Sequence, residues 1–185
     1  LTRNPRHVYE KVRAYRERYP DKAIIADGRE SGAWPVFMAG GSMYEQATPF
    51  LNEQKLPEGH LLGPADETPE ATKATADVHL LELISNHLAD HNLQQTKPLD
   101  LAENPGKNWC LADTGRTVLA YSSQGGSMTL DYTGMKGLLR ARWFDPATGE
   151  LEDYGKGTVQ GGQQITFKSP ADGNKWLLWL NNDRK

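Results

Sequence analysis

The sequence predicts an α+β protein in which a short α/β segment is followed by an antiparallel β-sandwich. Two observations predict this fold class. Residues 7–45 alternate helix and strand patterns, a rhythm typical of parallel strands joined by helices. Residues 108–180 instead contain seven or eight short strand patterns separated by Gly, Pro, Asn and Asp turn signals, as sandwiches do.

The α/β segment begins with a helical pattern over residues 7–19. Its apolar positions form one stripe, made of Val8, Val12, Tyr15 and Tyr19. The elements that follow are predicted as a buried strand, a short helix and a second strand, at residues 22–26, 33–39 and 42–45. Helix, strand, helix, strand is the order of a parallel α/β unit.

A long acidic stretch separates the two regions. Residues 46–68 lack periodicity, and Thr68-Pro69 then starts a terminal helix over residues 69–92. His87 and His91 are spaced i, i+4 on this helix, which is compatible with one metal ion. Because no third ligand is suggested, we favour a helix edge packed on other elements, and we predict neither a metal site nor a cofactor.

The best-defined element of the β region is a strand over residues 138–144 that runs into a tight hairpin. One face of the strand carries Leu139, Ala141 and Trp143. Asp145-Pro146 favours a type I turn, and Gly149 can adopt the left-handed conformation that returns the chain. Trp143 is therefore expected between the sheets, with stacking on a sugar as the alternative.

Composition limits the partners. The 185 residues suffice for one large domain or two small ones, and the net charge of −3 argues against nucleic acid. No apolar run approaches the roughly 20 residues of a membrane-spanning helix.

Cys110, the only cysteine, is expected to be a small buried hydrophobe. Because the chain starts at Leu1 rather than Met, we expect it to be the tail of a longer protein.

Motifs distributed over the β region carry a family resemblance. They lie at residues 110–113, 121–126, 128–131, 143–146, 148–150 and 167–178. Together they resemble the family named "putative collagen-binding domain", a β-sandwich that ends apiosidase-like (β/α)8-barrel glycoside hydrolases. Arg29, Trp34 and residues 38–42 are similar to the last βα segment of such a barrel.

The resemblance implies two domains. Residues 1–100 would be the C-terminal fragment of a TIM-barrel glycoside hydrolase-like domain, a remnant of its last βα units, and residues 108–182 the sandwich. A whole barrel needs about 250 residues, so part of the catalytic machinery would lie upstream of this chain. Trp176 is then expected in the sandwich core, and Trp179, on the opposite face, exposed or packed on the barrel.

The resemblance also suggests where a catalytic carboxylate would lie. Glycosidases use two carboxylates across the scissile bond, and barrels place them where strands end. Asp27 and Glu30 follow the first predicted strand and Glu45 ends the second, so these three are candidates in the parent protein. The alternative for Asp27 and Glu30 is that they solvate a helix start. This chain alone is not expected to contain a complete catalytic pair.

The function implied is that of a C-terminal fragment of a secreted, bacterial-type carbohydrate-active protein, extracellular or periplasmic, whose sandwich is a non-catalytic accessory domain. Its ligand would be a polysaccharide or a fibrous protein. The alternative is a stand-alone module that binds polysaccharide or collagen, and a third possibility is a structural domain that only covers the edge of the barrel.

Overall fold

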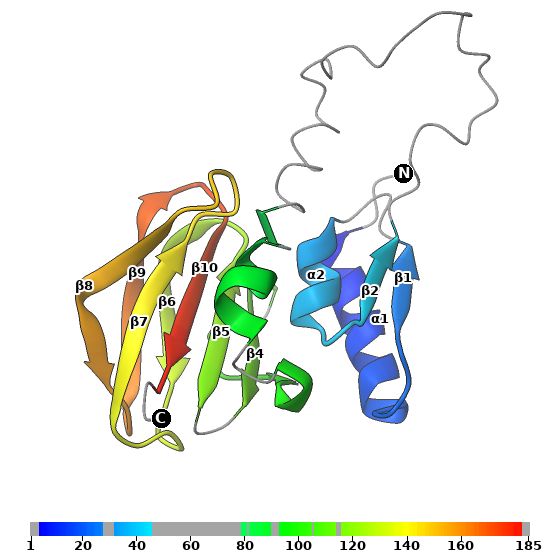
Figure 1. The fold of residues 1–185 in the computed structure, drawn as a ribbon, viewed down its shortest axis with the longest axis horizontal. Coiled ribbons are helices and arrows are strands. Elements are labelled where there is room, and N and C mark those ends of the chain that lie inside the picture. The colour runs from blue at the N-terminus through cyan, green and yellow to red at the C-terminus, as the bar shows by residue number, and fades with distance from the viewer. Residues whose placement is uncertain are drawn as a thin grey trace, which may run out of the picture.

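A computed structural model describes residues 4–27, 32–45, 79–80, 82–89, 93–104, 106–113 and 116–182. An α/β segment lies against one face of a β-sandwich (Figure 1). The elements are α1 (Pro5–Arg18), β1 (Ile25–Asp27), α2 (Ala33–Met38), β2 (Met43–Glu45), a π-helix (Ile84–Leu88), a 3₁₀ helix (Leu93–Gln95), β3 (Lys97–Leu99), β4 (Asn108–Asp113), β5 (Thr117–Ser122), β6 (Gly125–Asp131), β7 (Leu138–Phe144), β8 (Leu151–Gln160), β9 (Gln164–Asp172) and β10 (Trp176–Asn181).

The α/β segment has the predicted order of elements. The side chain of Asn4 caps α1 by accepting a hydrogen bond of 3.0 Å from the Arg6 N–H, and Pro5 occupies the first turn, where a missing N–H is tolerated. β1 and β2 pair in parallel, from Ile25 opposite Met43 to Asp27 opposite Glu45. The prediction of parallel strands joined by a helix is therefore confirmed for these two strands.

The predicted burial of this segment is only partly correct. Ile24 is buried, but Ile25 is 60% exposed, so β1 is not the buried strand that its apolar run predicts. On α1, Val8 and Val12 are buried whereas Tyr15 is exposed, as is Tyr19, the residue that follows the helix.

The predicted terminal helix is described only in part. Residues 79–80 and 82–89 are helical, and the rest of the predicted 69–92 helix lies outside the described residues. His87 is exposed, with its ring centroid 6.3 Å from that of Trp179, and His91 is also outside the described residues. Within the described ranges, no group of three His, Cys, Asp or Glu side chains could hold a metal ion, and no helix is long and apolar enough to cross a membrane.

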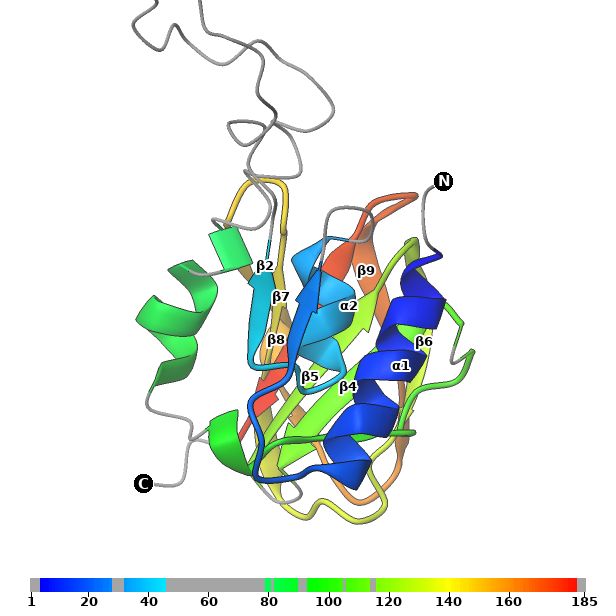
Figure 2. The same ribbon diagram turned by 90° about the vertical axis from the view of Figure 1, so that its right-hand side faces the viewer.

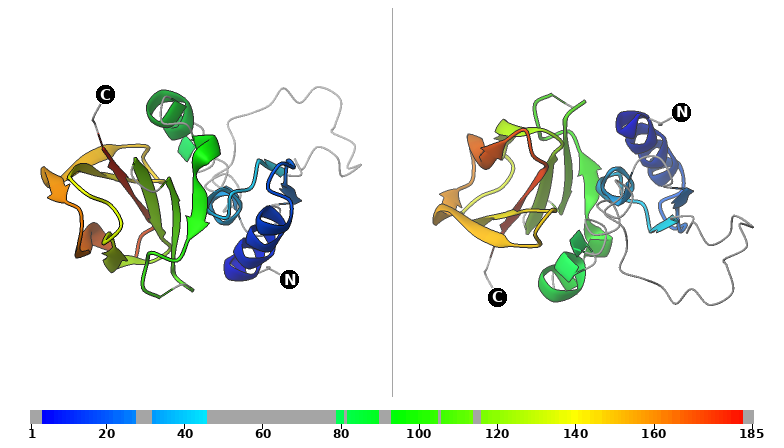
Figure 3. Two further views of the ribbon diagram at one scale, coloured as in Figure 1. Left: turned by 90° about the horizontal axis from the view of Figure 1, so that it is seen from below. Right: turned by 90° about the horizontal axis from the view of Figure 1, so that it is seen from above.

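The β region is a sandwich of two antiparallel sheets. The larger sheet has the strand order β3-β4-β5-β10-β7-β8, and the smaller one pairs β6 with β9. Figure 3 shows the molecule along its strands: the α/β segment lies outside the sandwich, with α2 next to the larger sheet. The predicted antiparallel β-sandwich is thus confirmed, and β3 is an additional strand that the sequence did not predict.

The hairpin after β7 has the predicted geometry. The Asp145 Oδ1 accepts a hydrogen bond of 2.8 Å from the Ala147 N–H, and the Gly149 N–H donates to the Asp145 carbonyl at 2.8 Å. Gly149 has φ of 78°, a value that a glycine adopts without steric cost. The turn therefore fixes the pairing of β7 with β8 next to it, from Phe144 opposite Leu151 to Arg142 opposite Asp153, beyond which the register shifts.

Two hydrophobic clusters lie on opposite faces of the larger sheet. The inner cluster, between the sheets, contains the predicted core residue Trp143, 2% exposed, whose ring meets Trp176 edge-on at 6.2 Å. Cys110 is buried in the same cluster, as predicted. The outer cluster joins the sheet to the α/β segment, and its sheet members are Trp109, Leu111, Leu119, Tyr121, Phe144, Leu177 and Trp179. Trp179 is thus packed against preceding elements and not exposed.

Candidate functional site

Two of the three candidate carboxylate residues occupy neighbouring strand ends. Asp27 ends β1 and Glu45 ends β2, and the two are direct partners in the parallel register. Adjacent strands lie about 4.8 Å apart, so their backbones are close together at the carboxyl edge of this small sheet. Glu30 lies outside the described residues. The side chains of Asp27 and Glu45 are also outside the described part, so their catalytic role remains a proposal.

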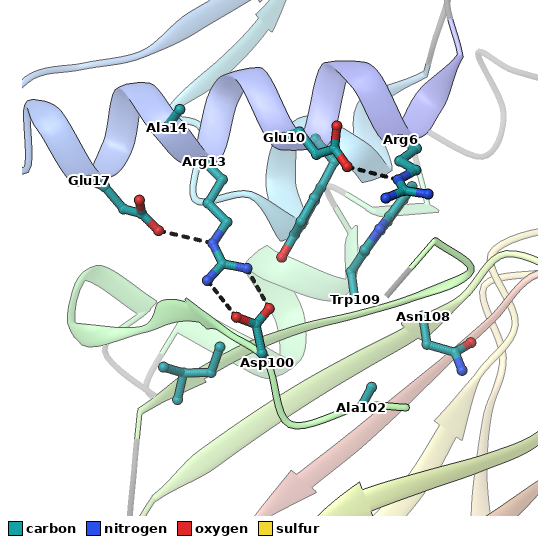
Figure 4. A pocket seen from close by; sticks show the side chains of 11 residues that line it. Arg6, Glu10, Arg13, Ala14, Glu17, Asp100, Ala102, Asn108 and Trp109 are labelled. Carbon is teal, nitrogen blue, oxygen red and sulfur yellow. Dashed lines mark hydrogen bonds and ion pairs between the residues drawn. The ribbon is translucent and has the colours of Figure 1, made fainter. Parts of the chain in front are cut away.

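A separate pocket of about 370 Å³ lies between α1 and the β3–β4 side of the larger sheet (Figure 4). Its charged side chains are paired with one another. Arg13 donates to both carboxylate oxygens of Asp100, at 2.5 and 2.9 Å, and also to Glu17 at 3.0 Å. Arg6 donates to Glu10 at 2.7 Å. The bidentate contact joins the helix to the residue that follows β3.

The electrostatics of this pocket favour a structural role. Hydrogen bonds from Arg13 lower the pKa of Asp100 below its ordinary value, and the same contact raises the pKa of Arg13. Burial raises the pKa of Tyr9, which also lines the pocket, to about 12. A carboxylate held in its ionised form is a poor general acid. The contact of Arg13 with Asp100 therefore acts as a clamp that holds α1 on the sheet.

Four stacked aromatic rings make a second contact between the α/β segment and the sheet. The ring of Tyr9 lies 4.9 Å from Trp109, Trp109 lies 5.6 Å from Tyr121, and Tyr121 lies 5.2 Å from Trp34, with interplanar angles of 7°, 14° and 9°. These rings come in turn from α1, β4, β5 and α2. Offset stacking of this kind adds stability beyond the burial of area.

The sequence contained a signal for this contact that our prediction did not use. β4 and β5 are apolar on both faces, with burial at nearly every position. Strands that are apolar at successive positions are typically covered on both sides. The second cover here is the α/β segment.

The start of the small parallel sheet is held by one arginine. Arg16 Nε donates to the Gly40 carbonyl at 2.7 Å, and its Nη2 donates to the Ser42 hydroxyl at 2.9 Å. Its Nη1 donates to the Lys22 carbonyl at 3.1 Å. A single side chain thus connects the approach to β1 with the approach to β2.

The glycine beside it allows a close backbone approach. A Cβ on Gly41 would lie 2.8 Å from the Val36 carbonyl oxygen, and the Gly41 N–H donates to that oxygen at 2.8 Å. Residues 38–42 therefore have a structural role here: they turn the chain from α2 into β2.

Comparison with known families gives two matches, each over less than half of the chain. Residues 99–181 match the family described as "Putative collagen-binding domain of a collagenase". Residues 2–57 match a "Domain of unknown function (DUF6298)". The comparison with curated proteins gives no match.

Two solved structures resemble the chain over most of its length. One, a glycoside hydrolase family 5 protein from Bacteroides vulgatus, is 15% identical with a TM-score of 0.70, and the match covers 97% of this chain and 46% of that one. The other, titled "Glycoside hydrolase", is 15% identical with a TM-score of 0.61 over 83% of this chain and 36% of that one. The chain thus spans less than half the length of either relative, and the likeness is one of fold. Its structural relatives are glycoside hydrolases, and its β-sandwich matches a collagen-binding domain family.

Proposed function

We propose that this chain is the C-terminal part of an apiosidase-like, carbohydrate-active glycoside hydrolase, exported to the periplasm or the outside of a bacterial-type cell. The β-sandwich is its non-catalytic accessory domain. Support comes from the two structural relatives, which are both glycoside hydrolases and both more than twice as long as the matched region.

The observation that carries the proposal is the small parallel sheet. β1 and β2 contain three residues each and, within the described part of the chain, pair only with one another. Parallel sheets are found almost only as larger sheets whose faces are covered by helices, and a two-stranded sheet is marginally stable by itself. We infer that α1, β1, α2 and β2 are the last units of a parallel barrel whose other strands precede this chain.

The sandwich is proposed to support the barrel and not to bind sugar through aromatic stacking. All five tryptophans are buried, since none exceeds 5% exposure. No tryptophan face is therefore free to serve as a platform for a pyranose ring. The outer face of the larger sheet, which a stand-alone module would present to solvent, is covered by α1, by α2 and by the helical residues Leu80, Leu83 and Leu88.

Catalysis in the parent is proposed to use one carboxylate from the carboxyl edge of β1 and β2. Asp27 and Glu45 are paired there, and Glu30 follows β1 in sequence. The partner carboxylate would come from a strand upstream of this chain, because retaining and inverting glycosidases both need two.

The test uses the longer protein and a panel of glycosides. Asp27→Asn and Glu45→Gln are prepared separately beside Glu10→Gln, an exposed ion-pair residue on α1 that serves as the control. At least one strand-end variant should lose turnover by about 100-fold or more, with the control unchanged. An active enzyme in which all three variants behave alike would overturn the assignment of the carboxylate to Asp27 or Glu45. A longer protein that hydrolyses no glycoside would overturn the proposed function.

A second function is favoured by the family match of residues 99–181: binding of a fibrous protein by the sandwich. Sedimentation of the 1–185 chain with insoluble collagen, and separately with insoluble polysaccharide, tests it. Binding to collagen alone would support this second function. Recovery of all the protein in the supernatant would refute it.

A further inference from the structure

A row of polar side chains crosses one end of the larger sheet. Asp113 on β4 lies opposite Thr117 on β5, and Thr117 lies opposite Asn181 on β10. Directly opposite residues of antiparallel strands point to the same face of the sheet, with Cβ atoms about 4.5–5.5 Å apart. Each of the three lies two positions from a residue of the outer cluster on its own strand, so all three side chains lie on the outer face. Figure 2 looks onto this face, with β4 and β5 behind α1 and α2.

Two oxygen atoms in this row are buried without a hydrogen bond. Thr117 is 0% exposed, and its Oγ1 has no hydrogen-bond partner among the described residues. The same holds for Oδ2 of Asp113, which is buried although the residue as a whole is partly exposed. Asn181 is 2% exposed, and its amide brings a further oxygen to the row. The great majority of buried polar atoms in folded proteins have a partner, so the carboxylate and the hydroxyl indicate a partner other than the protein.

The charge of Asp113 decides which kind of partner fits this place. Among the described residues, no arginine, lysine or histidine forms an ion pair with Asp113. Arg140, which lies opposite Asn181 on the next strand, is paired with Asp153 at 3.6 Å. Burying a carboxylate oxygen is costly unless the charge is paired or coordinates a metal ion. A water molecule would donate hydrogen bonds but leave the charge uncompensated, so the chemistry favours a cation.

We propose that Asp113, Thr117 and Asn181 bind one calcium ion on the outer face of the sheet, through the carboxylate Oδ2, the hydroxyl Oγ1 and the amide oxygen. Ca²⁺ takes about six to eight oxygen ligands in variable geometry, and water completes its shell, whereas Mg²⁺ demands a nearly ideal octahedron. A single carboxylate makes a weak site, with a dissociation constant of about 10⁻⁴–10⁻³ M. Because only one ligand is acidic, the site contains no group of three His, Cys, Asp or Glu side chains, and it was not predicted from the sequence.

The ion joins three neighbouring strands whose ends are already held together. The Asn182 N–H donates to the Arg116 carbonyl at 2.8 Å, and the Arg116 N–H donates to the Asp113 carbonyl at 3.1 Å. These bonds connect the end of β10 with the turn between β4 and β5. Binding therefore needs no rearrangement of the backbone, and an ion that binds only the folded state stabilises it by mass action.

Thermal unfolding of the 1–185 chain measures this stabilisation. Calcium chloride at about 10 mM should raise the unfolding temperature by about 3 °C or more above its value in EGTA. Magnesium chloride at the same concentration controls for ionic strength and should raise it by less than about 1 °C. The absence of a rise with calcium, or equal rises with the two salts, would overturn the inference.

Two variants locate the ion. The rise with calcium should be lost in Asp113→Asn and reduced by about half or more in Thr117→Val. Asp21→Asn and Thr158→Val, at exposed positions, are the matched controls and should keep the full rise. Each variant is compared with itself in EGTA, so a general loss of stability does not affect the result. A full rise in Asp113→Asn would overturn the site.

Terbium luminescence gives a second readout, which a merely structural role of these side chains would not produce. Tb³⁺ takes oxygen ligands as Ca²⁺ does, and it emits when an excited indole ring lies close to it. Trp179 precedes Asn181 by two residues on the same face of β10, about 7 Å along the strand. Excitation of tryptophan should therefore produce terbium emission from the natural chain, and an excess of Ca²⁺ should remove it. Asp113→Asn should abolish the emission, and equal emission from both chains, or none from the natural chain, would overturn the inference.

Discussion

At the scale of single residues, large aromatic side chains at successive positions of one strand face opposite sides of the larger sheet and so belong to two separate cores. Trp143 faces the inner cluster and Phe144, its neighbour in sequence, faces the outer one. A shift of one residue in register would exchange the two faces and place Arg142 in the core. The hairpin anchored at Asp145 prevents that shift.

Replacement of Trp143 by alanine should cost about 3–5 kcal/mol of unfolding free energy, because a large buried ring and its edge-on contact with Trp176 are lost. Leu138→Ala, at a position of the same strand that is 55% exposed, should change stability by less than about 0.5 kcal/mol. Chemical denaturation of both variants gives the comparison. A loss below about 1 kcal/mol at Trp143 would mean that the faces of the strand are assigned wrongly.

The contact between Arg13 and Asp100 should make stability depend on acid pH. The pKa of Asp100 is lowered by folding, so the folded state holds fewer protons, and the contribution is present at neutral pH and lost as the pH falls below 3.8. Asp100 is mostly exposed, which limits the contribution to less than about 1 kcal/mol.

Asp100→Asn should therefore lower the unfolding temperature at pH 7, and this effect should shrink as the pH falls below 3.8 and the carboxyl of the natural protein becomes protonated as well. Asp21→Asn, at another exposed carboxylate, is the control. If the difference in unfolding temperature between Asp100→Asn and the natural protein persisted unchanged at acid pH, the effect would come from the shape of the side chain and not from its charge.

At the scale of elements, the strands that could be predicted from the sequence are those whose local sequence signals agree with the contacts that they make in the fold. β7 and its hairpin were predicted with the correct bounds because alternation, the Asp-Pro turn and Gly149 all indicate the same structure. Most of β8 was missed, since glycine and charged residues disfavour strands. Gly155 and Gly157 have φ of 55° and 76° there, and they lie where the pairing with β7 shifts register, between the paired residues 151–153 and 158–160.

The candidate site was predictable only in outline. Periodicity placed Asp27 and Glu45 at the ends of two parallel strands, which the structure confirms. The clamp of Arg13 on Asp100 joins residues that are 87 positions apart, and no local pattern reveals such a pair. The stack that includes Tyr9 and Trp34 is equally non-local.

Gly41 offers a test of the connection between α2 and β2. Gly41→Ala should destabilise the chain by about 1–3 kcal/mol, because the added Cβ would lie within 2.8 Å of the Val36 carbonyl oxygen and would force the backbone apart. Gly134→Ala, where a Cβ would meet nothing within 4 Å, should be neutral or slightly stabilising. If the two variants changed the unfolding temperature equally, the connection between α2 and β2 would tolerate the displacement of its backbone.

At the scale of the whole molecule, the outer cluster makes the α/β segment and the sandwich depend on each other. The sequence predicts a sandwich with its own core, and the inner cluster provides one. The outer face of its larger sheet nevertheless carries Trp109, Tyr121 and Trp179, all covered by preceding elements.

A chain shortened to residues 96–185 should therefore expose this apolar face. We expect it to unfold at a lower temperature than the 1–185 chain and to self-associate, since exposed apolar patches of this kind drive aggregation. Light scattering and thermal unfolding of the two chains measure both effects. Equal stability and a monomeric state would show that the outer cluster contributes little.

The most direct test of the central claim is hydrolysis of one glycoside panel by two proteins: the 1–185 chain and the longer protein that contains it. Our account predicts turnover by the longer protein and none by the 1–185 chain, whose proposed carboxylates lack their partner from an upstream strand. Turnover by the 1–185 chain would contradict the claim that it is the C-terminal part of the enzyme and not a complete one.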